Sequence, residues 1–206
     1  MKPAISIPRQ LFTLSWPVLV AQAAVMANTL VDTLMAGQIS PIDLAAVGVG
    51  ASIYATVFVS AMGVMLALPP IVAHHFGAQR YAEIGADVRQ SAWLAIFLSI
   101  AAMLALQFPE PMLSFSRLEP ALELKVRAYL DGVSWSIPAM LFFRVFYGFA
   151  MGIGRPRPIM VLNVAGLGLK LFFNYLLMFG HFGFPALGST GAGWSSAAVM
   201  SVLAIG

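Results

Sequence analysis

The sequence predicts an all-α membrane protein, a lobe of six transmembrane helices joined by short connections. Of the 206 residues, 60% are hydrophobic and only 9% are charged, whereas about a quarter of the residues in an average soluble domain are charged. The mean hydropathy of +0.89 points the same way. The number of helices follows from six apolar runs in the chain, because each membrane-spanning helix needs about 20 apolar residues.

Each predicted helix is an apolar run bounded by polar, glycine or proline residues. The first run follows Lys2 and Arg9; it is too long for a cleavable signal peptide and lacks a small-residue cleavage pattern. Gly37 and Pro41 mark the turn before the second helix. A polar connection, 74–90, precedes the third. The six predicted helices cover about 11–36, 44–73, 92–108, 126–152, 159–180 and 191–206.

The later helices follow a longer loop and a proline-containing segment. The loop covers 109–125, and Pro156 and Pro158 disfavour helix in the residues before them. From Gly191 the sixth run has 16 residues, about 24 Å of helix, against a hydrocarbon core of about 30 Å. We therefore expect residues 1–206 to be the N-terminal lobe of a longer protein, with a truncated last helix. The alternative is a complete six-helix protein whose last helix begins at Pro185.

The distribution of basic residues predicts a cytoplasmic N-terminus. Cytoplasmic loops of membrane proteins carry an excess of Lys and Arg, and this orientation places six basic residues inside and three outside. The inner residues are Lys2, Arg9, Arg80, Arg89, Arg155 and Arg157, and the outer ones are Arg117, Lys125 and Arg127. We read these residues as topology signals within a net charge of only +3, and predict no nucleic-acid partner.

A carboxylate inside the first apolar run is the main candidate for function. Asp32 interrupts a stretch long enough to cross a bilayer. Ionisable residues in such a position are costly, and they pair with one another or mark an ion or substrate pathway. Asn28 lies four residues before Asp32 and Thr29 three before it, so both share its helical face.

The predicted fifth helix carries a polar stripe. Asn163, Lys170 and Asn174 return to nearly one helical angle. Asp32 and Asn174 are expected at similar depth in the outer half of the membrane, with Lys170 one turn deeper. If the first and fifth helices are neighbours, the ammonium offsets the cost of the carboxylate in one buried cluster. That cluster either couples ions to transport or is a structural ion pair that fixes helix packing.

Two further membrane residues stand out. Arg144 lies ten residues from Gly154, too deep for its side chain to reach the interface easily, so it either lines an inner cavity or pairs with a helix-end carbonyl. Pro17 removes a backbone hydrogen bond within the first helix and makes it a candidate hinge.

The sequence contains none of the enzyme motifs that we sought. Walker, HExxH and GxSxG patterns are absent, and the histidines have no metal-ligand partner at helical spacing. Cysteine is absent as well. We therefore expect no catalytic residue, no cofactor and no bound metal, and an ion gradient as the energy source if the protein is a pump.

Several segments resemble the N-terminal half of a multidrug and toxic compound extrusion (MATE) transporter of the bacterial NorM-like branch. They are SWPVLVAQAAVMANTLVDTLMAGQIS, LAAVGVGASI, IVAHHFGAQR and NYLLMFGHFGFPALGSTGAG, and they match in order over essentially the whole chain. The resemblance implies a twelve-helix, two-lobe fold in the bacterial inner membrane. It also implies alternating access, with export of cationic amphipathic drugs in exchange for H⁺ or Na⁺. The implied partners are these drugs, the lipid bilayer and a C-terminal lobe.

The resemblance also assigns residues. Asp32 matches the family's first-helix aspartate for proton or cation coupling, and Asn174 matches the fifth-helix polar position of that cluster. Ser196 falls at a sixth-helix hydroxyl position, and Pro17 at a proline linked with bending. Lys170 stands where an asparagine is often found. Its ammonium can take the space of a Na⁺, which argues against direct Na⁺ coordination in this lobe and leaves protonation of Asp32 open. Two alternatives to the antiporter remain: a lipid-linked precursor flippase of the same superfamily, and a half-length membrane module that dimerises.

Overall fold

The computed structural model describes residues 7–113, 118–183 and 185–205, and all the regular secondary structure in these ranges is helical. The prediction of an all-α fold is thus confirmed. Lys2, Arg117 and Gly206, which entered the sequence predictions, lie outside the described residues. The helices are α1 (Ile7–Ile39), α2 (Pro41–Met65), α3 (Leu68–Gly77), α4 (Tyr81–Gln107), α5 (Glu110–Leu113), α6 (Pro120–Ser134), α7 (Ile137–Gly152), α8 (Arg157–Phe179) and α9 (Ser189–Ile205).

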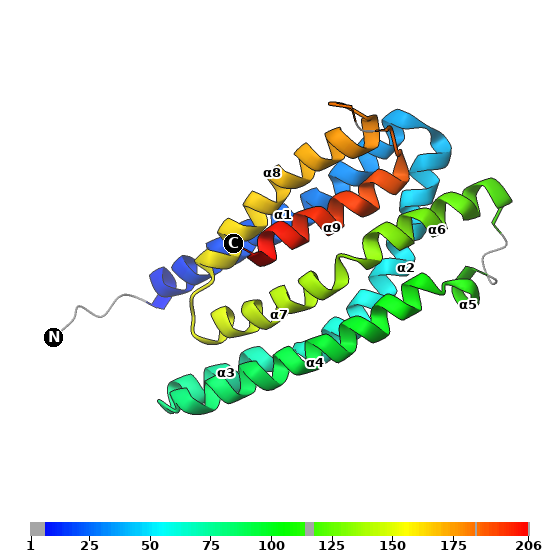
Figure 1. The fold of residues 1–206 in the computed structure, drawn as a ribbon. Helices are drawn as coiled ribbons and strands as arrows, with labels where there is room; N and C mark the ends of the chain where they lie inside the picture. Colours follow the sequence, from blue (N-terminus) through cyan, green and yellow to red (C-terminus); the bar gives the residue numbers. More distant parts are fainter. Residues whose placement is uncertain (1–6, 114–117, 184, 206) are drawn as a thin grey trace.

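The long helices run along one common direction and form an elongated bundle (Figure 1). α1 packs along α8, and α9 packs against both α8 and α6. α3 and α7 lie against each other and against α4. The predicted first and fifth helices, which are α1 and α8, are therefore neighbours, as the proposed ion pair requires.

Four stretches are long and apolar enough to cross a membrane: Leu11–Ile39, Pro41–Gly77, Tyr81–Gln107 and Arg157–Phe179. The pair α6 and α7 meets the same measure when taken together and is bent by 47° at its break, which would make a fifth span. α9 is shorter, with 17 residues, and runs back alongside α8.

The helix bounds differ from the expected ones at three places. The third helix begins at Tyr81 and not near 92, because charged residues remain helical where the helix leaves the apolar region. The expected helix over 44–73 is interrupted between α2 and α3, where Pro69 and Pro70 occupy the first turn of α3. The expected helix over 126–152 begins earlier, at Pro120, and is broken before Pro138 in the first turn of α7. Proline is tolerated in a first turn but not in a helix interior.

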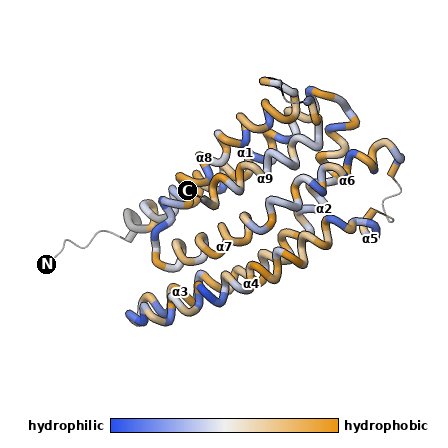
Figure 2. Tube along the Cα trace, in the orientation of Figure 1, coloured by the Kyte–Doolittle hydropathy of each residue, from blue (hydrophilic) through white to orange (hydrophobic). Residues whose placement is uncertain are grey.

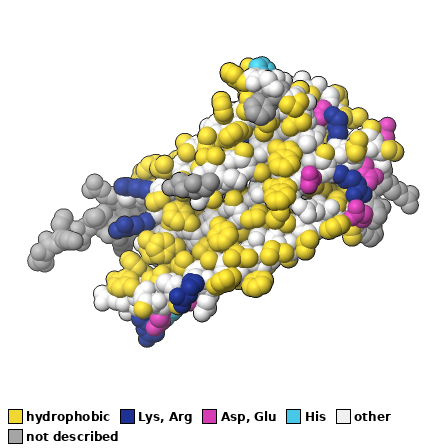
Figure 3. All heavy atoms as spheres, viewed as in Figure 1, with side chains coloured by type: hydrophobic (Ala, Val, Ile, Leu, Met, Phe, Trp, Pro, Cys, Tyr) yellow, Lys and Arg dark blue, Asp and Glu magenta, His cyan; other side chains and the backbone are white. Residues whose placement is uncertain are grey.

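Charged side chains gather at the two ends of the bundle, with a broad hydrophobic band between them (Figure 3). In Figure 2 hydrophobic residues cover most of α4 and α7, and hydrophilic residues collect at the turn between α3 and α4. The main core lies between these helices, α2 and α6, where Leu106, Leu130, Ile137 and Leu141 are almost completely buried. This pattern is that of a bundle that turns apolar side chains both to its core and to lipid.

Candidate functional site

A cavity of about 400 Å³ lies between α1, α2, α6, α7, α8 and α9. Its lining is mostly aliphatic and aromatic. The charged side chains among the described lining residues are Asp32, Arg144 and Lys170. Tyr54 and Phe58 of α2 stack face to face on its wall, with ring centroids 5.6 Å apart. A mostly apolar cavity with a few converging polar groups is the usual form of a small-molecule site.

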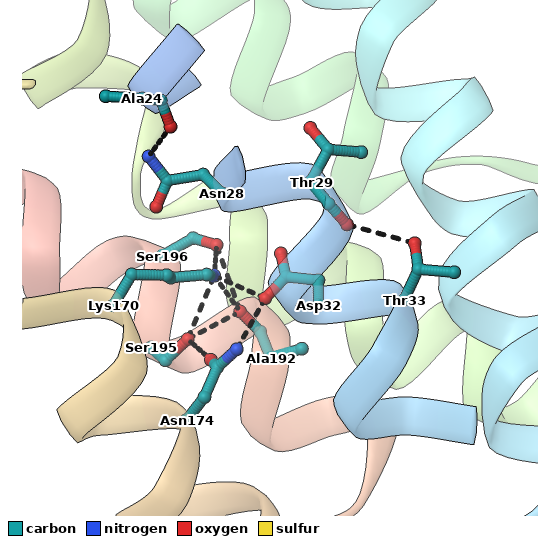
Figure 4. Close-up of polar contacts among 10 residues, drawn as sticks. All are labelled: Ala24, Asn28, Thr29, Asp32, Thr33, Lys170, Asn174, Ala192, Ser195 and Ser196. Atoms are coloured by element: carbon teal, nitrogen blue, oxygen red, sulfur yellow. Dashed lines mark hydrogen bonds and ion pairs between the residues drawn. The ribbon is translucent and has the colours of Figure 1, made fainter. Parts of the chain in front are cut away.

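The centre of the polar lining is an ion pair between α1 and α8 (Figure 4). Lys170 Nζ lies 3.1 Å from Asp32 Oδ1, and the side chains are 4% and 13% exposed respectively. Asn174 Nδ2 donates to the same Asp32 oxygen at 2.6 Å. The predicted cluster of Asp32, Lys170 and Asn174 therefore forms in the structure, and its role is argued below.

The start of α9 completes the surroundings of the ammonium. Lys170 Nζ donates to the Ala192 carbonyl and to Ser195 Oγ at 3.0 Å each, and to Ser196 Oγ at 2.5 Å. Ser195 Oγ also donates to Asn174 Oδ1. Lys170 thus has four oxygen partners when Asp32 is counted, whereas an ammonium carries three hydrogens.

Small residues and a tight turn bring α9 close enough for these contacts. A Cβ at Gly191 would lie 2.6 Å from the Leu177 carbonyl oxygen of α8, so only glycine permits this approach. Gly180 ends α8 in the left-handed conformation, with φ of 73°, as helix C-termini commonly do. The returning chain then bonds to the end of α8, because Leu187 N–H donates to the Leu177 carbonyl and Gly188 N–H to the Met178 carbonyl.

Outside the ion-pair cluster, the cavity is lined by three other predicted site residues, Asn28, Asn163 and Arg144. Asn28 donates to the Ala24 carbonyl of its own helix at 3.1 Å, and no hydrogen bond from it to Asp32 is present in the described structure. Asn163 and Arg144 also border the cavity. Pro17 is fully buried within α1, and the helix continues through it without a break.

The sequence reasoning missed Ser195 and the Ala192 carbonyl. Ser195 is fully buried, and its hydroxyl links Asn174 to Lys170. The signal available in the sequence was the adjacent pair Ser195 and Ser196 after a glycine-containing helix start. Only the packing of α9 against α8 shows that both hydroxyls face one ammonium.

A second buried carboxylate, also missed, joins three helices at the far end of the bundle. Asp43 is 2% exposed, lies 2.7 Å from Lys125 Nζ of α6 and accepts the Ser189 N–H of α9 at 3.0 Å. Ser40 Oγ donates to it at 2.6 Å, while the Asp43 N–H donates to Ser40 Oγ. Ser40 thus caps the start of α2, and Asp43 serves as a structural tie between α2, α6 and α9.

An exposed ion pair at the same end joins α5 to α6. Arg127 Nη1 lies 2.7 Å from Glu110 Oε1 and a second guanidinium nitrogen donates to Glu123. The Arg127 hydrogen bond holds the pKa of the Glu110 carboxyl below its usual value. Exposed pairs of this kind contribute little to stability, so we assign it no part in the cavity.

The bundle and its charged cavity define the class of this protein: a multi-pass helical membrane protein with an ion pair in an apolar cavity. Its family follows from comparison with known proteins. A family model described as MatE matches residues 17–176, which is more than half of the chain. The chain belongs to the MatE family.

Relatives with curated names support the same family. The chain is 38% identical over 196 residues to a probable multidrug resistance protein NorM of Aromatoleum aromaticum, covering 95% of this chain and 42% of that protein. It is 38% identical over 199 residues to the multidrug resistance protein PmpM of Pseudomonas aeruginosa, covering 96% and 42%. The chain therefore spans less than half the length of these relatives.

Solved structures share the fold. A Vibrio cholerae MATE transporter, VcmN, in its bent form superposes with a TM-score of 0.80 at 19% identity, over 95% of this chain and 44% of that one. An outward-facing multidrug resistance MATE family transporter of the MOP superfamily gives a TM-score of 0.85 at 19% identity, over 95% and 43%. The predicted half of a two-lobe MATE fold is thus confirmed.

Proposed function

We propose that this chain is the N-terminal lobe of a secondary multidrug efflux antiporter, and that Asp32 is its coupling carboxylate. Cationic amphipathic compounds would be exported in exchange for H⁺ or Na⁺. The observation that carries the proposal is the Asp32–Lys170 ion pair, which is buried in the membrane region and borders the cavity. The names of the NorM and PmpM relatives agree with multidrug resistance as the function.

In this proposal, protonation of Asp32 and its pairing with a cation exclude each other. The carboxylate oxygen that meets Lys170 also accepts from Asn174. A proton on Asp32 removes the negative charge that attracts Lys170 or a cationic compound. The ammonium then keeps the Ala192 carbonyl and the two serine hydroxyls as partners, so neutralising Asp32 does not leave a buried cation without hydrogen bonds.

The same arrangement favours H⁺ over Na⁺ as the coupling ion in this lobe. Oxygen atoms of Asp32, Ala192, Ser195 and Ser196 surround the ammonium. Carboxylate, carbonyl and hydroxyl oxygens are the groups that bind hard cations, but here Lys170 already occupies the space between them.

We place the N-terminus on the cytoplasmic side of a bacterial inner membrane, with a second lobe completing the transporter.

The coupling role is tested by Asp32→Asn in cells that express the complete gene. Export of a fluorescent cation and growth in the presence of a toxic cation are expected to fall to the level of cells without the gene. The protein should remain in the membrane, because Asn keeps the size of the side chain and can still accept the Asn174 N–H.

A matched control is Asp131→Asn, which makes the same chemical change at an exposed position outside the cavity. This variant should export normally. Normal export by Asp32→Asn, at equal protein level, would rule out Asp32 as the coupling carboxylate. Energising vesicles separately with a proton gradient or a Na⁺ gradient identifies the ion, and we expect the proton gradient to drive export.

A further inference from the structure

A second hollow lies at the end of the bundle that holds the α3–α4 turn. It has a volume of about 480 Å³ and is bordered by the end of α3, the first turns of α4 and the end of α7. Apolar side chains form most of its lining, among them Ile84, Val88, Phe149 and Ile153. It shares no lining residue with the cavity around the ion pair. We call this second hollow the end groove.

Aromatic side chains at the rim place the end groove at the boundary between hydrocarbon and water. Phe76 at the end of α3 and Tyr81 at the start of α4 are exposed, and their rings meet edge to face with centroids 6.0 Å apart. Tyrosine is common at this boundary because its ring is apolar and its hydroxyl is polar. α4 is polar at its start and becomes apolar from Ala92 onward. The groove therefore opens where lipid head groups lie.

The charged residue among the described lining of the end groove is Arg155, just after α7. Its side chain is exposed, and its backbone is fixed by the turn that ends α7, where Gly154 has a φ of 69° and the Arg155 N–H donates to the Ala150 carbonyl at 2.8 Å. In the ranges that the structure describes, no ion pair engages Arg155. Its guanidinium is therefore available to an anion from outside the chain.

The carboxylates at the start of α4 lie on another face of that helix and have partners there. Glu83 Oε2 lies 3.3 Å from His75 Nε2, and Asp87 Oδ2 lies 2.9 Å from His75 Nδ1. Glu83 and Asp87 each precede a groove residue, Ile84 and Val88, by one position, which is a rotation of about 100° around a helix. The groove therefore combines an apolar lining with a net positive charge at its rim.

We propose that the end groove binds an anionic phospholipid of the surrounding membrane, with an acyl chain on the apolar lining and the phosphate at Arg155. The paired N–H donors of a guanidinium match two phosphate oxygens, and basic pockets between membrane helices bind anionic head groups. A soluble anion would leave the apolar lining uncovered, and a lipid without net charge would leave the guanidinium uncompensated. This site is separate from the efflux cavity and does not depend on antiport.

The test compares dioleoyl phosphatidylglycerol with dioleoyl phosphatidylcholine, which have the same acyl chains and differ in net charge. The protein from the complete gene is purified in a non-ionic detergent and titrated with each lipid, and native mass spectrometry gives the affinity of the tightest bound lipid. The wild type is expected to bind phosphatidylglycerol about fivefold more tightly, as one basic residue beside an anionic head group allows. Excess inorganic phosphate should not displace it.

The first variant, Arg155→Gln, removes the charge. It should lose about fivefold in affinity for phosphatidylglycerol and keep its affinity for phosphatidylcholine. The matched control is Arg157→Gln, which removes the same charge from an exposed residue at the same end of the bundle but outside the groove lining. The control should keep the preference of the wild type.

The second variant, Gly85→Leu, fills the groove. A Cβ at Gly85 would meet no atom within 4 Å, so a larger side chain can enter the hollow without displacing its walls. This variant should bind both lipids at least fivefold more weakly, about the effect of displacing one or two buried CH₂ groups. Gly168→Leu is the matched control, because Gly168 is an exposed helical glycine of α8 with equally open space; it should bind as the wild type does. Thermal unfolding checks that each variant is folded.

Equal affinity of the wild type for the two lipids overturns the proposal, as does an unchanged preference in folded Arg155→Gln. If Arg157→Gln weakens phosphatidylglycerol binding as much as Arg155→Gln, the end of the bundle attracts anions without a defined site, which also overturns it. Tight binding by folded Gly85→Leu would place the lipid elsewhere, and displacement by inorganic phosphate would identify a soluble anion as the ligand. None of these measurements requires transport, so the antiport proposal is tested independently.

Discussion

The Lys170 ammonium has four oxygen partners and only three hydrogens. Lys170 therefore depends less on Asp32 than Asp32 depends on Lys170. Without the carboxylate, the ammonium still has the Ala192 carbonyl, Ser195 and Ser196. Without the ammonium, Asp32 retains the hydrogen bond from Asn174 and loses the opposite charge that compensates it. The two partners are therefore not equivalent, although they belong to one ion pair.

We predict that Lys170→Met destabilises the protein more than Asp32→Asn does. Removing the cation leaves a buried carboxylate uncompensated, at a cost of about 3–5 kcal/mol, whereas Asp32→Asn leaves the ammonium with three oxygen partners that satisfy its hydrogens. The double variant Asp32→Asn with Lys170→Met should recover most of that loss, because no net charge then remains in the cluster. Thermal unfolding of the purified variants measures all three effects.

If the loss of stability in the double variant equals the sum of the losses in the two single variants, this account is contradicted. Stability changes add for independent sites and do not add for coupled ones. The recovered double variant should still fail to export. A double variant that is stable but does not export would show that the pair couples ions to transport. A purely structural ion pair, the alternative left open by the sequence, predicts normal export by a stable variant.

The cluster also shows how far single residues can be predicted. Spacing on one helix correctly grouped Lys170 with Asn174, and burial cost correctly linked them to Asp32. Asn28 was grouped with Asp32 by the same spacing, but its amide bonds to the Ala24 carbonyl one turn earlier. The Ala192 carbonyl and Ser195 could not be assigned, because their contacts depend on how closely α9 approaches α8, and a backbone carbonyl leaves no mark in a sequence.

At the scale of the helix, α1 passes through Pro17 without interruption. Proline removes one backbone hydrogen bond and crowds the preceding turn, so the helix is locally destabilised at this position. α6 and α7 show the other outcome, a break with a 47° bend. The same residue type thus accompanies a continuous helix in one place and a broken one in another.

We predict that Pro17→Ala preserves the fold and reduces export severalfold, because α1 then resists bending. Alanine restores the missing N–H and is better than proline in a helix interior by about 3 kcal/mol. Spin labels at two exposed positions, Phe12 of α1 and Val161 of α8, would report the motion in the complete protein. Two distances are expected in the wild type and one in Pro17→Ala. Wild-type export by the variant, with both distances retained, would show that Pro17 is not a hinge.

The helix boundaries show a limit of hydropathy as a guide. Apolar runs identify the part of a helix that lies in an apolar surrounding, and they located α1, α8 and α9 to within a few residues. They do not identify where a helix continues into water, which is why the polar segment at the start of α4 was expected to be a connection. The proline signals before α3 and α7 were present in the sequence, but whether such a proline bends or breaks a helix depends on the packing around it.

For the whole molecule, the two ends of the bundle differ in charge. The end formed by the α3–α4 turn and the start of α8 carries Arg80, Arg155 and Arg157. The opposite end carries Lys125 and Arg127 together with Glu110 and Glu123, which pair with Arg127. Loops rich in Lys and Arg favour the cytoplasm, while acidic residues contribute little to orientation. On this basis we propose that the first end faces the cytoplasm.

This orientation can be tested directly, because the chain contains no cysteine and one introduced thiol can therefore report one position. We predict that Ala78→Cys, at the exposed α3–α4 turn, reacts with a membrane-impermeant maleimide only after the cells are opened. Ala121→Cys, exposed at the start of α6, should react in intact spheroplasts, severalfold above cells expressing the protein without the introduced cysteine. Alanine to cysteine changes little volume, so neither variant should disturb folding, and export serves as the check. The reverse labelling pattern would place the N-terminus outside, and it would also invert the direction of transport assigned to the cavity.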